Sequence, residues 1–116
     1  MIELLNPALA LVSIGLGLIG WFAPRYTMDV LDLQRGQSTM GLSEMRAVSG
    51  CLFVGLGGGA LLLGSAEAYL MVGCAWGGAA VGRATSLVAD DAPTRGTRIF
   101  FAVEAAVAAL LIANNL

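Results

Sequence analysis

Four ionisable side chains lie inside or next to stretches of sequence that are otherwise apolar. Arg83 and Glu104 fall within two such stretches, and Glu44 and Arg46 stand at the start of a third. A lone charge in the middle of a membrane costs about 2.5–3.5 kcal/mol on insertion scales, so an oppositely charged partner is expected. Arg83 with Glu104 is the simplest pair, and Glu44 and Arg46 could complete a polar cluster on the same side.

This predicted cluster of Glu44, Arg46, Arg83 and Glu104 has two interpretations. The structural one is a buried ion pair that fixes the register between helices. The functional one is a polar pocket for an anionic or quinone-like headgroup, or a carboxylate that carries protons. Proton transport is the weaker hypothesis, because a relay needs several acids at different depths and only Glu104 is deep.

Other kinds of chemistry find no support in the residue types. The chain has no histidine, which removes the commonest metal ligand, general base and axial haem ligand. No nucleophile with a base, phosphate-binding loop or metal-ligand spacing occurs, so we expect neither an enzyme nor a cofactor or metal site. Cys51 and Cys74 are expected to be packing residues that do not bridge. The six basic residues form no basic cluster, and we expect no nucleic-acid partner.

Composition indicates that these residues are positioned by membrane helices. Of the 116 residues, 58% are hydrophobic and only 12% are charged. A spanning helix needs about 20 mostly apolar residues, and four stretches meet that length. They run from about Leu5 to Phe22, Ser43 to Leu63, Ala66 to Val88 and Arg98 to Ala113. We therefore predict an all-α fold, a single four-helix transmembrane domain over residues 1–116 with antiparallel, alternating helices in the lipid bilayer.

Several residues mark the expected ends of these helices. Ser43 is suited to cap the second, Gly64 and Ser65 separate the second from the third, and Thr97 or Thr94 can cap the fourth. The 24–42 loop is too polar to span. It is predicted to form either a short helix lying on the membrane interface or an irregular loop.

The arginines predict the orientation. With four crossings, Arg25, Arg35, Arg46, Arg83, Arg95 and Arg98 all fall on or near the side opposite the two termini. Arginine and lysine gather on the cytoplasmic side of short-looped membrane proteins. We therefore expect a multi-pass protein of the bacterial inner (plasma) membrane with both termini on the periplasmic side.

Small residues recur at helical spacing and predict close helix packing, because association in lipid depends on close approach. They are Gly55 and Gly59 in the second stretch, Gly73, Gly77, Gly78 and Gly82 in the third, and Ala102, Ala106 and Ala109 in the fourth. These faces either pack the helices of the chain against one another or dock to another subunit or a second copy.

Some of the residues above also carry a resemblance. The run Gly41-Leu-Ser-Glu-Met-Arg-Ala, the element Gly82-Arg83-Ala84 with Ser86-Leu87, and an acidic residue in the last stretch resemble an uncharacterised bacterial family of small four-helix membrane proteins, a domain of unknown function. That family is distantly similar to DoxX-like membrane proteins. The resemblance covers nearly the whole chain; it implies a four-helix bundle with a polar cluster and implies no activity. Ser49 departs from the aromatic residue expected there.

From these observations we expect a non-catalytic inner-membrane protein. Its role would be that of an accessory or assembly subunit that docks through small-residue faces to a larger membrane complex, for instance a respiratory or photosynthetic one. The alternative is a lipid- or quinone-binding bundle, or a minor transporter, that uses the Glu44, Arg46, Arg83 and Glu104 cluster.

Overall fold

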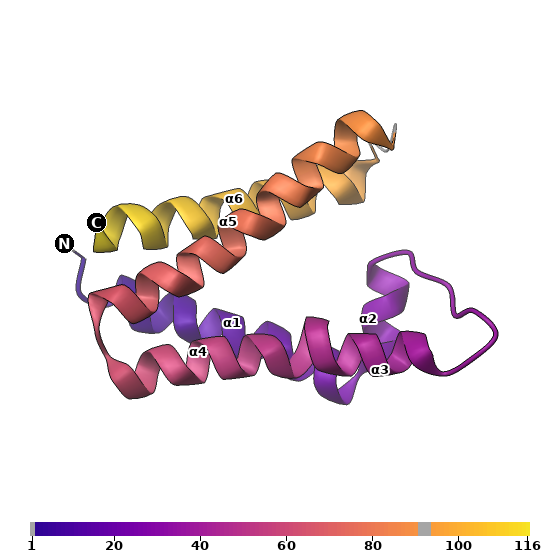
Figure 1. Cartoon of the computed structure of the whole chain (residues 1–116), viewed down its shortest axis with the longest axis horizontal. Helices are drawn as coiled ribbons and strands as arrows, with labels where there is room; N and C mark the ends of the chain where they lie inside the picture. The colour runs from indigo at the N-terminus through magenta and orange to yellow at the C-terminus, as the bar shows by residue number, and fades with distance from the viewer. Residues whose placement is uncertain (1, 91–93) are drawn as a thin grey trace. The chain divides into compact units, whose positions relative to one another are not determined.

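The chain folds entirely into helices and connecting turns over the part that the structure describes. A computed structural model describes residues 2–90 and 94–116 (Figure 1). Its elements are α1 (Leu5–Phe22), α2 (Pro24–Val30), α3 (Met40–Arg46), the π-helical turn η1 (Ala47–Cys51), α4 (Leu52–Leu63), α5 (Ala66–Ala89) and α6 (Arg95–Asn115). Elements α3, η1 and α4 follow one another without a break, so they form one helix over Met40–Leu63. The predicted all-α class is confirmed.

The predicted helix ends agree with the structure in some places and not in others. Thr94 caps α6 by accepting a hydrogen bond from the backbone N–H of Thr97 at 3.1 Å, and Gly64 takes a left-handed backbone conformation between α4 and α5. Ser43 is not a cap, because the helix already begins at Met40. A helix also forms in the 24–42 loop: α2 starts at Pro24, whose missing N–H costs nothing in a first turn.

Within the described residues, three helices, not the predicted four, are long and apolar enough to cross a membrane. They are Leu5–Phe22, Met40–Leu63 and Arg95–Asn115, and no more than 22% of the most apolar window of each is buried inside the protein. The expected third span corresponds to α5. That helix is long enough at 24 residues, but it carries Arg83 and four glycines and does not reach the hydropathy of the three spans. The large exposed apolar surface of the three spans indicates a membrane protein.

The chain divides into two compact units, which we describe separately. The unit of residues 10–62 holds most of α1 together with α2 and the Met40–Leu63 helix. Its α1 buries a stripe of small residues, Ala10, Ser13, Gly17 and Gly20, at helical spacing. Small side chains on this stripe let the backbones of neighbouring helices come close.

The other unit joins residues up to Leu9 with residues 63–116, and its centre is the α5–α6 pair (Figure 1). Gly73 on α5 faces Leu111 and Ile112 on α6, whereas Gly77 faces Ala108. The residue numbers rise on α5 as they fall on α6, so the two helices run in opposite directions. Leu111, fully buried, fills the space opposite Gly73.

Candidate functional site

Arg83 and Glu104 form the ion pair that the sequence predicts. The Arg83 Nε atom donates to Oε1 of Glu104 at 3.1 Å, and Nη2 donates to Oε2 at 3.0 Å. Two parallel bonds between a planar guanidinium and a carboxylate are the strongest geometry such a pair can adopt. The Glu104 side chain is 12% exposed and that of Arg83 is 33% exposed, so the pair is partly buried between α5 and α6.

The guanidinium of Arg83 has a second neighbour on α6. Its central carbon lies 5.4 Å from the centre of the Phe100 ring, a distance at which a cation is attracted to the ring face. Phe100 lies four residues, about one helical turn, before Glu104, so both groups reach Arg83 from the same helix face. The pair and the ring together hold α5 and α6 in one register, which supports the structural interpretation of Arg83 and Glu104.

Arg46 and Glu44, the other two members of the predicted cluster, lie on α3 in the unit of residues 10–62. Arg46 Nη1 donates to the backbone carbonyl oxygen of Trp21 at 2.6 Å, whereas Glu44 is exposed. Trp21 stands in the last turn of α1, where carbonyl groups lack a partner within the helix. Arg46 therefore ties the end of α1 to α3, and the full four-residue cluster stays a prediction.

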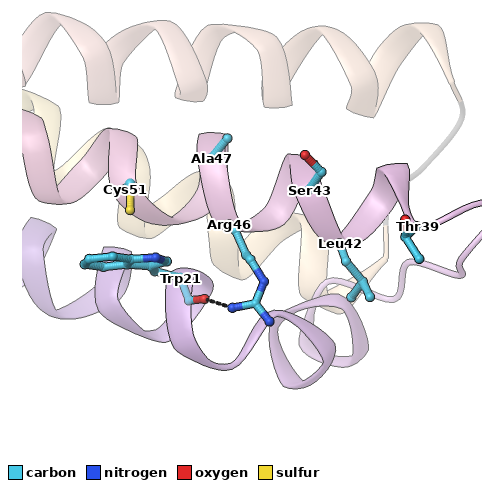
Figure 2. Close-up of a pocket in the computed structure, with 7 residues that line it drawn as sticks. All are labelled: Trp21, Thr39, Leu42, Ser43, Arg46, Ala47 and Cys51. Atoms are coloured by element: carbon cyan, nitrogen blue, oxygen red, sulfur yellow. Dashed lines mark hydrogen bonds between the residues drawn. The ribbon is translucent and has the colours of Figure 1, made fainter.

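A groove of about 580 Å³ opens beside this hydrogen bond. Figure 2 shows Arg46 extending from its helix to the Trp21 carbonyl, with Leu42 and Cys51 on the same helix before and after it. Ala47 completes the apolar part of the lining, and Thr39 and Ser43 add hydroxyl groups. We call this hollow the Arg46 groove; of its lining residues, only Arg46 was predicted to belong to a site.

The π-helical turn η1 begins directly after Arg46. The backbone N–H of Leu52 bonds to the carbonyl of Ala47, five residues back, in place of the usual four. Such π-turns occur mostly as single turns within α-helices and are frequent at functional sites. Here the turn supplies Ala47 and Cys51 to the Arg46 groove.

Glycines of the π-turn and α4 also lie close against the backbone of α1. A β-carbon on Gly57 would lie 2.5 Å from the Ala10 carbonyl oxygen, and one on Gly50 would lie 2.6 Å from the Trp21 backbone nitrogen. Gly17 and Gly20 on α1 are equally crowded, since added β-carbons there would meet the backbone at Gly50 and Ser49. Gly20, Gly50 and Gly57 were not among the predicted faces, although their small size was the available signal.

Most of the small-residue faces that the sequence predicts are open within their own units. An added β-carbon would meet nothing within 4 Å at Gly55, Gly59, Gly78 or Gly82, and Ala102, Ala106 and Ala109 are exposed. Gly73 and Gly77 differ, because they face α6. We refer to the first seven residues as the open faces.

Comparison with known proteins assigns a family. Residues 4–114 match the family model described as "Domain of unknown function (DUF4345)". The chain belongs to this family. No curated protein and no solved structure matches the chain. The DUF4345 match extends from the residue before α1 to the last turn of α6, so the ion pair, the Arg46 groove and the open faces all lie inside the DUF4345 domain.

The two ends of the DUF4345 domain are joined by asparagine side chains. Asn6 and Asn115 exchange amide hydrogen bonds of 2.7 and 2.8 Å, and Asn114 donates to the Asn6 Oδ1 atom at 3.1 Å. Asn114 also bonds to both the backbone N–H and the carbonyl of Ile2. The first turn of α1 and the last turn of α6 therefore lie together, a contact that the sequence reasoning missed.

Proposed function

We propose that this DUF4345 protein is a non-catalytic membrane subunit that docks through its open faces to other subunits of a membrane complex, or to copies of itself. The observation that carries the proposal is the open space at Gly55 and Gly59 on α4 and at Gly78 and Gly82 on α5. Small residues at four-residue spacing allow two helices to approach closely in lipid, where no hydrophobic effect drives them together.

The polar groups support a structural reading over a catalytic one. Arg83 and Glu104 satisfy each other across α5 and α6, and Arg46 is bonded to the end of α1. A lipid- or quinone-binding bundle, or a minor transporter, that uses all four charged residues stays the alternative. It would require Glu44 and Arg46 to act together with the Arg83–Glu104 pair.

The proposed topology has four crossings in the bacterial inner membrane, with both termini on the periplasmic side. Three helices meet the length and apolarity of a span, and three crossings alone would leave the two termini on opposite sides. Two observations support a further crossing by α5. It lies antiparallel to the spanning helix α6 with its Arg83 charge paired, and the asparagine contacts hold Asn6 and Asn115 together. A paired charge enters a bilayer at lower cost than a lone one.

Substitution of open-face glycines tests the docking proposal. The protein is purified in a mild detergent, and its assembly state is measured by size-exclusion chromatography with light scattering. Gly78→Leu and Gly82→Leu should keep the helical circular dichroism of the wild type and shift the protein from an assembly to a monomer. Gly15→Leu is the matched control, because Gly15 is also in open space but belongs to none of the predicted faces.

Two results would contradict the proposal. One is a wild-type protein that is purely monomeric and brings no membrane protein with it in mild detergent. The other is an assembly that the Gly78→Leu, Gly82→Leu and Gly15→Leu variants all keep unchanged.

A further inference from the structure

The charge of Arg46 is not neutralised within the Arg46 groove. Arg46 uses Nη1 for the Trp21 carbonyl, and no carboxylate is among the groove's lining residues. A guanidinium carries five N–H donors and stays protonated at every physiological pH. The groove thus offers one full positive charge with further donors to an anion that enters it.

The lining on either side of Arg46 suits an amphiphile better than a free ion. The wall of the groove is mostly apolar and is formed by Trp21, Leu42, Ala47 and Cys51. The hydroxyl groups of Thr39 and Ser43 lie toward the start of the helix. A molecule with an anionic head and an apolar tail matches both parts. The head would lie at the Arg46 guanidinium, and the tail would follow the helix toward Cys51.

The position of the groove along the spanning helices points to the same class of ligand. It lies at the last turns of α1 and the first turns of the Met40–Leu63 helix, the level at which a spanning helix leaves the hydrocarbon. Trp21 is of the residue type that favours this interface. The connection between the two spans carries Arg25 and Arg35 beside Asp29 and Asp32. Orientation follows the basic residues of short connections, which lie by the leaflet that holds anionic lipids.

We propose that the Arg46 groove binds an anionic phospholipid, with the headgroup phosphate on the Arg46 guanidinium and one acyl chain along Ala47 and Cys51. Membrane lipid surrounds the exposed apolar surface of the spanning helices, so phospholipid is always present next to the groove. The bond to the Trp21 carbonyl holds the guanidinium in place for the phosphate. This inference does not depend on docking through the open faces.

The test uses the thiol in the groove as a reporter. Cys51 lines the groove and Cys74 is exposed on α5, so Cys74→Ser leaves Cys51 as the only thiol. The delipidated Cys74→Ser protein in detergent is mixed with phosphatidylglycerol, phosphatidylcholine or inorganic phosphate. The rate of Cys51 alkylation by N-ethylmaleimide is then measured. Phosphatidylglycerol should slow the reaction at concentrations about tenfold lower than phosphatidylcholine, and inorganic phosphate should not slow it.

Three variants locate the lipid headgroup. Arg46→Gln should weaken protection by phosphatidylglycerol by at least about tenfold, because a hydrogen-bonded charge is lost. Arg98→Gln removes an exposed arginine on α6 as the control and should leave protection unchanged. Ala47→Phe fills the groove while the Arg46 charge remains, and it should abolish binding of phosphatidylglycerol in native mass spectrometry.

Several outcomes would overturn the proposal. These are equal protection by phosphatidylglycerol and phosphatidylcholine, full protection by inorganic phosphate alone, or wild-type binding by the Arg46→Gln or Ala47→Phe variant. If Arg46→Gln does not fold, because it also loses the bond to Trp21, the Ala47→Phe variant and the choice between the two lipids decide the matter.

Discussion

Glu104 on α6 receives two hydrogen bonds from Arg83 on α5, at 3.1 and 3.0 Å, so each charged group is the main partner of the other. Glu104 is 12% exposed, which leaves little water to replace Arg83 if that side chain is removed. The energetic role of the pair is therefore best measured by removing one partner and then both.

We expect Arg83→Gln and Glu104→Gln each to lower the free energy of unfolding by about 1–3 kcal/mol, because each leaves a partly buried charge without its partner. The value should be near the lower end for Glu104→Gln, since the stranded Arg83 is 33% exposed and can reach water. Unfolding in detergent, followed by circular dichroism, measures the loss.

The double variant Arg83→Met with Glu104→Met is the control. Replacing a buried ion pair with apolar residues is often neutral or stabilising, so it should unfold close to the wild type. A double variant as unstable as the two single losses added together would contradict a purely pairwise role.

Two adjacent glycines on α4 test how closely α1 and α4 pack. Gly57→Ala should destabilise the protein by about 1–3 kcal/mol, because the new β-carbon would lie 2.5 Å from the Ala10 carbonyl oxygen and the two helices must separate. Gly58→Ala, one residue further on, meets nothing within 4 Å and should be neutral or stabilise by up to about 1 kcal/mol. Equal effects of the two substitutions on thermal unfolding would show that α1 and α4 do not pack through Gly57.

Cysteine labelling from one side of the membrane tests the contact between the chain ends. In a background with Cys51→Ser and Cys74→Ser, we expect Ile2→Cys and Leu116→Cys to react with a membrane-impermeant maleimide from the periplasmic side. Both residues adjoin the asparagine contacts that join Asn6 to Asn114 and Asn115. Gln37→Cys, in the connection between α2 and α3, should react only after the membrane is opened. Labelling of just one terminus in intact cells would rule out this topology.

The Thr94 cap at the start of α6 is expected to stabilise the folded protein. Thr94→Ala removes the side-chain oxygen that accepts from the Thr97 backbone N–H at 3.1 Å, so it should cost about 1 kcal/mol. Thr85→Ala is the matched control, because the Thr85 hydroxyl only donates to the Val81 carbonyl within α5 and the residue is exposed. The two variants are compared by thermal unfolding; a cost as large for Thr85→Ala would remove the capping explanation.

The fold was predictable where apolar length decides it. The α1 helix has the expected bounds, Leu5–Phe22, because Pro24 ends it and the apolar run is uninterrupted. The start of the next long helix was wrong by three residues, since Met40, Gly41 and Leu42 contain no cap residue and the N-terminal cap, Thr39, makes no side-chain bond. The α5 helix was predicted as a fourth span. Its glycines allow close packing with a neighbouring helix, but they do not raise its apolarity to that of the three spans.

Contacts between oppositely charged side chains could be predicted from the sequence, whereas contacts to backbone groups could not. Arg83 and Glu104 had to find partners in an apolar setting, and they pair as expected. Arg46 was expected near a carboxylate, yet it bonds to the Trp21 carbonyl, which no side-chain pattern marks. The asparagine contacts were missed for a related reason, since Asn6 and Asn115 are far apart in sequence and an amide can find partners almost anywhere on a helix end.

The π-helical turn between Arg46 and Leu52 takes up one residue more than an α-helical turn would. Because the surplus residue is held within one wide turn, the helix before it and the helix after it keep nearly the orientation of an uninterrupted α-helix that is one residue shorter. Deletion of Val48 should therefore leave Arg46 facing the end of α1 and Gly57 facing Ala10. The change would stay local to the turn that supplies Ala47 and Cys51, so a one-codon deletion would reshape the wall of the groove and spare the contacts between the helices.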